Sequence, residues 1–169
     1  QGDITAAFGN LTRITAAALG VDRASIWMFD PEHDTLSCTD LFCASMNEHS
    51  AGQSIKVVEH PAYFSSLLNE EYIAADDAMN DGRLKAFKES YLKPLGIGSV
   101  LDVPILHGGR VQGVLCLEHI GAPITWTAEQ RLFGTAIANF ASLALERQER
   151  AKAEEDLREA NRSVEAANK

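Results

Sequence analysis

The sequence predicts an α+β fold, an antiparallel sheet of about five to six strands with a helix at each end of the chain. Short segments rich in β-branched and aromatic residues recur as far as His119, and turn-forming residues separate them. Apolar side chains at three- and four-residue spacing mark both ends of the chain, which indicates helices there. The sheet is therefore expected between the two terminal helices in sequence, with shorter helices in its middle.

The N-terminal part predicts a helix followed by a hairpin. Asp3 is placed to cap a helix whose apolar pattern continues to near Gly20. Segments 23–29 and 35–42 are then expected to pair as a β-hairpin, because the turn-forming run 30–34 joins them.

The middle of the chain alternates short strands with short helices. The expected elements are a strand over 54–58, a helix over 62–69, a strand over 72–75 and a helix from 84 to about 92. Pro61 suits the first turn of the earlier helix, where an N–H has no intrahelical partner. Pro94 and Gly96 are expected to end the later one.

Gly108 and Gly109 indicate the tip of a second hairpin, because glycine supplies the positive φ of a tight turn. Its strands are expected over 99–106 and 111–119. The expected pairing places Asp102 on one sheet face with apolar neighbours, namely Val100, Pro104, Leu115 and Leu117.

Asp102 is an acid among apolar side chains, and burying its carboxylate is costly unless it has a hydrogen-bond or ion-pair partner. We expect Arg83 or Tyr91 to supply it. Asp102 is then either a hydrogen-bonded brace that holds the mid-chain segment to the sheet, or an acid that faces a ligand.

A long helix is expected to close the chain. Thr127 and Gln130 form a capping box, and the helical pattern runs from Ala128 to about Asn168. At ~1.5 Å per residue this helix exceeds the breadth of the domain, so its end is expected to project. An early stripe is expected to pack on the domain: Leu132, Phe133, Ala136, Ile137, Phe140, Leu143 and Ala144. A heptad seam follows, offset at 146–150: Ala153, Leu157, Ala160, Val164 and Ala167.

The charge balance argues against two classes of partner. The net charge is −9, from 15 basic and 24 acidic side chains. Binding to phosphates needs the opposite sign, so neither nucleic acid nor an anionic membrane surface is expected. No run approaches the ~20 consecutive apolar residues of a membrane span. The chain begins without Met or a leader pattern, and we expect it to be a piece of a longer protein.

The cysteines predict neither a disulfide framework nor a metal site. Cys38, Cys43 and Cys116 form no CxxC pair, and their number is odd. A reducing cytoplasm fits this pattern best. No nucleophile stands beside a base in a recognisable context, so no catalytic residue is expected and the domain is predicted to be non-catalytic.

Two segments carry a resemblance to a known family. They read GIGSVLDVPILHGGRVQGVLCLEHIG over 96–121 and WTAEQRLFGTAIANFASLALE over 126–146. Together they look like the GAF domain of bacterial signalling proteins. The tail LREANRSVEAANK is similar to the helix that often precedes the phosphoacceptor helices of sensor histidine kinases. The resemblance implies a sensory domain over 1–146 and a coiled-coil signalling helix over 147–169 that leads to an output domain.

The resemblance also implies terminal helices on one sheet face and a small-molecule pocket on the other. The candidate ligand-binding residues are Tyr63, Phe64, Arg83, Phe87, Tyr91 and Asp102. A ligand or partner is expected to shift the terminal helices, which form a parallel homodimer, and thereby to signal to a C-terminal histidine kinase. Two alternatives stay open: a structural dimerisation module without a ligand, and the sensory domain of a diguanylate cyclase.

The ligand types of the family can be compared with this sequence. Bilin-binding members attach the pigment through a mid-chain cysteine, and residues 60–95 contain none. Cyclic-nucleotide-binding members carry an N-K-F-D-E signature, which Phe87-Lys88-Glu89 matches only in part. Members that reduce methionine sulfoxide group their cysteines in a glycine-rich loop, a pattern that is not found here. Haem stays open, because one histidine suffices as an axial ligand. The sequence names neither the ligand nor a cofactor.

Overall fold

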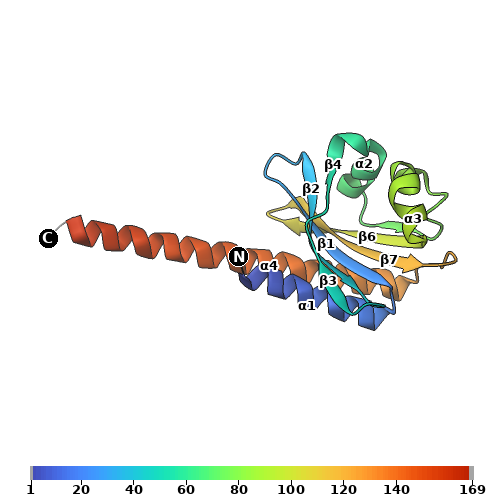
Figure 1. Cartoon of the computed structure of the whole chain (residues 1–169). Coiled ribbons are helices and arrows are strands. Elements are labelled where there is room, and N and C mark those ends of the chain that lie inside the picture. Colours follow the sequence, from blue (N-terminus) through green and yellow to red (C-terminus); the bar gives the residue numbers. More distant parts are fainter. Residues whose placement is uncertain (1, 168–169) are drawn as a thin grey trace.

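An antiparallel seven-stranded sheet forms the centre of the computed structural model, which describes residues 2–167 (Figure 1). The strands are β1 (Arg23–Phe29), β2 (Thr35–Cys43), β3 (Glu48–Ser50), β4 (Ser54–Lys56), β5 (Ile73–Ala75), β6 (Ile97–His107) and β7 (Arg110–Ile120). They lie in the order β3-β2-β1-β7-β6-β5, and β4 also pairs with β2. The fold class expected from the sequence is confirmed.

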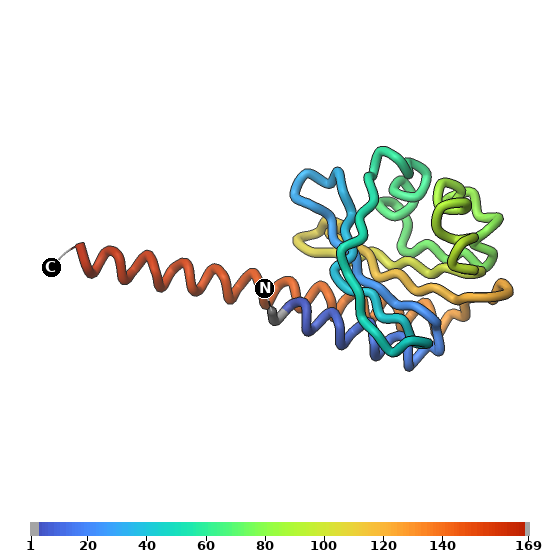
Figure 2. Tube along the Cα trace, in the orientation of Figure 1, coloured from blue at the N-terminus to red at the C-terminus, as the bar shows by residue number. Residues whose placement is uncertain are grey.

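Helices cover both faces of this sheet. They are α1 (Gly2–Leu19), α2 (Pro61–Asn69), α3 (Lys93–Leu95) and α4 (Ala128–Ala167), with the 3₁₀ turns η1 (Val57–Glu59) and η2 (Gly82–Phe87) and the π-helical turn η3 (Lys88–Leu92). α1 and the first half of α4 lie side by side on one face, and α2 lies with the η2–α3 segment on the other (Figures 1 and 2). The second half of α4 projects from the domain, as expected. No helix within residues 2–167 is apolar over enough of its length to cross a membrane.

Two predicted details at the edges of the fold are wrong. α1 begins at Gly2, so Asp3 lies within the helix and does not precede it; the Asp3 side chain lies outside the described part of the chain. Strand β3 was not expected, because its residues Glu48, His49 and Ser50 are polar and exposed. It pairs with the end of β2 through its backbone, and the ring of His49 also contacts Asp40 and Phe42 of β2. A strand of three polar residues leaves no hydrophobic alternation in the sequence.

The expected mid-chain helix is not an α-helix. A 3₁₀ turn is followed by the π-helical turn η3, in which the N–H of Lys93 bonds to the carbonyl of Lys88, five residues back. Pro94 comes next and has no N–H with which to continue an α-helical ladder. The chain therefore ends this segment in a widened turn, and Gly96 reverses it at a φ of 66°.

The sheet separates two apolar cores, and β6 contributes to both. Leu101 and Val103 point to the core beneath α1 and α4, which also contains Trp126. Val100 belongs to the core on the opposite face, beneath α2 and η2. Because strand side chains alternate between faces, one strand links the two layers residue by residue.

The register of the β6–β7 hairpin differs by one residue from the expected pairing. A bulge between Ile105 and Leu106 shifts the strands, so Asp102 faces Cys116 across the pair. Leu115 and Leu117 therefore belong to the helix-side core, and not to the face of Asp102. Asp102 instead shares its face with Cys116 and Glu118.

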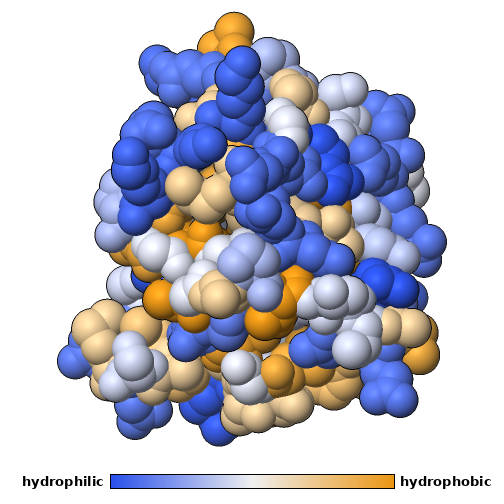
Figure 3. Space-filling view, turned by 90° about the vertical axis from the view of Figure 1, so that its right-hand side faces the viewer, coloured by the Kyte–Doolittle hydropathy of each residue, from blue (hydrophilic) through white to orange (hydrophobic). Residues whose placement is uncertain are grey.

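The early stripe of α4 packs only in part. Ile137, Ala138 and Ala141 are buried against the sheet and α1, whereas Leu132 and Phe140 are 72% and 56% exposed. The expectation that the whole stripe covers the domain is wrong, because α1 occupies part of the same sheet face. Figure 3 views the end of the domain opposite the tail, where near-neutral and hydrophobic side chains gather in the lower part, the level of α1 and α4.

Candidate ligand-binding site

A cavity of about 310 Å³ lies between the sheet and the segments that cover its outer face. Strands β1, β2, β6 and β7 form its floor, and α2, η2, η3 and the chain around β4 form its cover. Its volume lies at the small end of the ~300–1,000 Å³ that ligand sites occupy. The π-helical turn matters here, because Ser90, Tyr91 and Leu92 all line the cavity although they are consecutive.

Asp102 lies in the floor and is only 3% exposed. The hydroxyl of Tyr63, from α2, donates a 2.6 Å hydrogen bond to its Oδ2. Its Oδ1 has no hydrogen-bond partner among the described residues. Burial raises the pKa of Asp102 to about 7, although the Tyr63 hydrogen bond opposes the shift. Burial and the neighbouring Asp102 also raise the pKa of Tyr63, which therefore stays a donor.

Glu118 is the second acid of the floor, and it is fully partnered. Nε of Arg23 lies 2.7 Å from one carboxylate oxygen, and the hydroxyl of Tyr91 donates to the other at 2.7 Å. Nη2 of Arg23 also donates to the Tyr91 hydroxyl at 3.2 Å. Burial lowers the pKa of Arg23, but Glu118 and Tyr91 raise it by more, so the guanidinium stays charged. This triad ties η3 to β1 and β7 through one closed hydrogen-bond network.

Aromatic rings form much of the cover. His60 stacks on Phe87 with ring centroids 4.1 Å apart, and Tyr63 meets Phe87 edge-on at 5.1 Å. Trp27 lies in the floor, with its indole N–H donating to Ser25. Burial lowers the pKa of His60. The cavity therefore offers flat apolar surfaces and a single incompletely bonded carboxylate.

The structure brings together four of the six predicted residues. Tyr63, Phe87, Tyr91 and Asp102 line the one cavity, and they come from α2, η2, η3 and β6. Phe64 does not line it; this ring is 2% exposed and packs in the apolar core, 5.8 Å from the ring of Phe29. The expected partner of Asp102 was also wrong, because Tyr91 bonds to Glu118.

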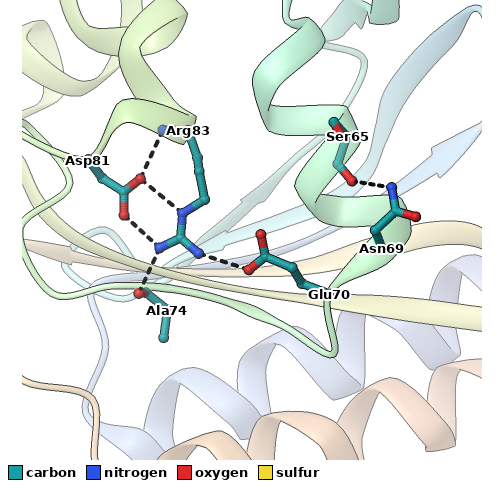
Figure 4. Close-up of polar contacts among 6 residues, drawn as sticks. All are labelled: Ser65, Asn69, Glu70, Ala74, Asp81 and Arg83. Carbon is teal, nitrogen blue, oxygen red and sulfur yellow. Dashed lines mark hydrogen bonds and ion pairs between the residues drawn. The ribbon is translucent and has the colours of Figure 1, made fainter.

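Arg83 lies outside the cavity lining and holds the cover in place (Figure 4). Its guanidinium bonds to both carboxylate oxygens of Asp81, at 2.9 and 2.6 Å, and to Glu70 at 3.0 Å. Nη2 also donates to the carbonyl of Ala74 in β5. The hydrogen bond from Arg83 lowers the pKa of Asp81. Arg83 is thus taken up by an acid two residues away and cannot be the partner of Asp102.

Several lining residues were not expected from the sequence, and they include His60, Trp27 and Glu118. Glu118 carries the same signal as Asp102, an acid inside an apolar strand, at a position two residues beyond Cys116. Cys116 also lines the cavity, where burial raises the pKa of its thiol far above the ordinary range. A buried thiol of that kind is a poor nucleophile.

The match to a known family covers most of the chain. The family described as "GAF domain" matches residues 3–145. The chain belongs to the GAF domain family. No curated protein matches the sequence significantly.

Solved structures with the same fold include two domains of the PixJ photoreceptors. The GAF domain of Thermosynechococcus elongatus PixJ, in its blue-light absorbing form, has a TM-score of 0.74 at 21% identity, and the match covers 89% of each chain. A structure of the cyanobacteriochrome receptor PixJ has a TM-score of 0.70 at 22% identity, over 86% of this chain and 97% of the other. A domain assigned to a two-component sensor histidine kinase of Sinorhizobium meliloti 1021 has a TM-score of 0.66 at 19% identity, over 86% and 93%. At these identities the likeness shows the fold alone.

GAF domains are sensory and regulatory modules, generally without catalytic activity, and this chain shares that general role. Within residues 2–167, no group of three or more His, Cys, Asp or Glu side chains is placed to hold a metal ion. The cavity between the sheet and the segments that cover it is the candidate site of regulation.

Proposed function

We propose that this GAF domain binds a small molecule in the cavity and passes the resulting change through α4 to an output domain, of which a histidine kinase is the first candidate. One observation carries the proposal, the position of β6 between the cavity and α4. Asp102 faces the cavity, while its neighbours Leu101 and Val103 belong to the core beneath α4. A ligand that moves Asp102 must therefore move the surface on which α4 rests.

The contact between β6 and α4 is close. Gly134 of α4 lies against Val103, so that a Cβ at this glycine would be 3.2 Å from Cγ2 of Val103. Packed interiors resist compression, so a small displacement of the strand is passed on to the helix. α4 then continues without a break to the projecting tail.

We also propose that the domain works as a parallel homodimer through its terminal helices. The exposed residues Leu132 and Leu143 follow the same alternating three- and four-residue spacing as Leu157 and Val164 in the tail. All four are at least half exposed in the single chain. A second copy of α4 would cover them along one seam, which the charged residues Glu146 and Arg150 interrupt, and it would support the projecting part of the helix. This arrangement places the two C-termini side by side, as a dimeric kinase needs.

A bilin is not part of the proposal. The PixJ domain absorbs blue light, but residues 60–95 of this chain hold no cysteine for pigment attachment, and Cys116 is buried in the floor.

The proposal is tested by native mass spectrometry of the chain purified from its host. We expect a retained small molecule with the parent chain. Val100→Phe should abolish retention, because Val100 lines the cavity. The matched control is Val111→Phe in the same hairpin, outside the cavity lining, and it should retain the same mass. The absence of a retained molecule from every sample would contradict the proposal and favour the structural dimerisation module.

A further inference from the structure

The cavity has an unbalanced charge. Among the described residues that line it, Asp102 and Glu118 are acidic and none is Lys or Arg. Arg23 neutralises Glu118 through a 2.7 Å ion pair. Burial lowers the pKa of His60, so this ring does not supply a positive charge at neutral pH. Asp102 is left as the one lining acid without a cationic partner.

Asp102 lines the cavity and has one carboxylate oxygen without a hydrogen-bond partner among the described residues. Tyr63 occupies Oδ2 at 2.6 Å, and Oδ1 lacks a hydrogen-bond partner among the described residues although it is fully buried. Buried carboxylate oxygens are nearly always hydrogen-bonded, because leaving one unpaired is costly. Tyr91 already donates to Glu118, and Arg83 is held by Asp81. The neighbour that remains is the thiol of Cys116, which faces Asp102 across the strand pair and is only a weak donor.

The walls add a requirement on shape. The stacked pair of His60 and Phe87, together with Trp27 and Tyr91, gives the cavity flat aromatic surfaces. Such surfaces favour planar ligands, and aromatic faces also attract cations. The volume of about 310 Å³ limits the ligand to a small compound.

We infer that the cavity selects a flat nitrogen compound, cationic or neutral, whose N–H donates to Oδ1 of Asp102, and that it rejects organic anions. The inference rests on the proposed ligand-binding function and narrows it to one chemical class. Above its pKa of about 7 Asp102 is an anion, so at pH 7.5 an anionic ligand of the same shape would meet like charge. No lining side chain offers such a ligand an unpaired cation. Carboxylates and phosphates are therefore excluded as groups that enter the floor of the cavity.

Three compounds of nearly identical shape test this selection. They are benzamidine, which is a cation with N–H donors; benzamide, which is neutral with N–H donors; and benzoate, which is an anion without donors. Their affinities for the full chain are measured by isothermal titration calorimetry at pH 7.5. Binding in the cavity is verified by NMR, from a shift of the indole N–H signal of Trp27, which lines the cavity, but not of Trp126, which lies in the opposite core.

We expect benzamidine to bind about tenfold or more tightly than benzoate, with benzamide between them. Asp102→Asn keeps the shape of the side chain and removes its charge. This variant should weaken benzamidine about tenfold and leave benzamide within about twofold. Asp77→Asn removes the same charge from an exposed loop and should leave the order of affinities unchanged.

The outcomes separate this inference from the proposed function. The inference would be overturned if benzoate bound as tightly as benzamidine, or if benzamidine had the same affinity for Asp102→Asn as for the parent chain. Either result would leave the proposed ligand-binding function intact. If none of the three compounds shifts the Trp27 signal, the inference fails, whereas the proposed ligand-binding function fails only if native mass spectrometry finds no retained molecule.

Discussion

Gly134 on α4 and Val103 on β6 are so close that a Cβ on the glycine would lie 3.2 Å from Cγ2 of the valine. The residue before Val103 is Asp102, whose side chain lies in the floor of the cavity on the opposite face of the sheet. The cavity and the projecting helix are therefore separated by the thickness of a single strand. The predictions below test the groups that build this arrangement.

Stability should depend on the ionisation of Asp102. Its pKa is raised from 3.8 to about 7, so the fold favours the neutral acid. The contribution of the protonated Asp102 to the free energy of unfolding is full below about pH 4 and is lost as the pH rises to about 7. Relative to the parent chain, Asp102→Asn should gain up to about 4 kcal/mol in its free energy of unfolding between about pH 4 and pH 8.

Urea unfolding of both proteins across this range measures the difference. Tyr63 of α2 and Cys116 of β7 face Asp102, and the pKa of each is raised by burial, so neither loses its proton in this range. Glu118 is held by Arg23 and Tyr91 in both proteins. A difference that does not vary with pH would show that Asp102 is ionised throughout.

Tyr63→Phe should remove the hydroxyl that donates to Asp102 and leave the weak thiol donor of Cys116. We expect a loss of about 1–3 kcal/mol in the free energy of unfolding at pH 8, with a smaller loss at pH 5, where the acid is neutral. The pKa of Asp102 should also rise, because the Tyr63 hydrogen bond lowers it in the parent chain. Carbon-13 NMR of the Asp102 carboxyl follows that pKa, and a fall would contradict the assigned bond.

Gly113→Ala tests the packing between β7 and β1. An added Cβ would lie 2.3 Å from the carbonyl oxygen of Trp27, which is backbone and cannot swing away. We expect a loss of about 1–3 kcal/mol from this overpacking, measured by urea unfolding. Gly82→Ala is the matched control, since a Cβ there meets nothing within 4 Å, and it should cost no stability. A Gly113→Ala variant as stable as the parent chain would show that β1 and β7 can move apart without a loss in the free energy of unfolding.

The dimer should depend on the exposed stripe of α4. Replacing Leu132 and Leu143 with Glu on the domain, or Leu157 and Val164 with Asp on the tail, puts charge into the predicted interface. Sedimentation equilibrium should show a weaker dimer for each pair, and the tail alone should associate weakly because its seam is rich in alanine. Gln148→Asp, off the stripe, is the control. A parent chain that is monomeric across micromolar concentrations would refute the dimer.

The sequence predicted the strands of the sheet better than it predicted the chemistry of the cavity. β1 lies at 23–29 as expected, because its β-branched and aromatic residues suit a pleated buried surface. The sequence correctly indicated that Asp102 needs a hydrogen-bond partner, but it did not identify Tyr63 as that partner. The bulge after Ile105 leaves no mark in the sequence, and it moves Asp102 opposite Cys116. The misplacement of Arg83 was avoidable, because Asp81 stands only two residues before it.

Hydrogen–deuterium exchange measures whether the cavity acts on α4 through β6. Val100→Phe fills the cavity from β6 and mimics an occupant, whereas Val111→Phe adds the same ring to β7 outside the cavity lining. Urea unfolding of both variants shows whether global opening contributes. We expect that Val100→Phe alone changes the exchange of the α4 amides over 130–145. Unchanged exchange there in Val100→Phe, with altered exchange only in α2 and η3, would contradict it.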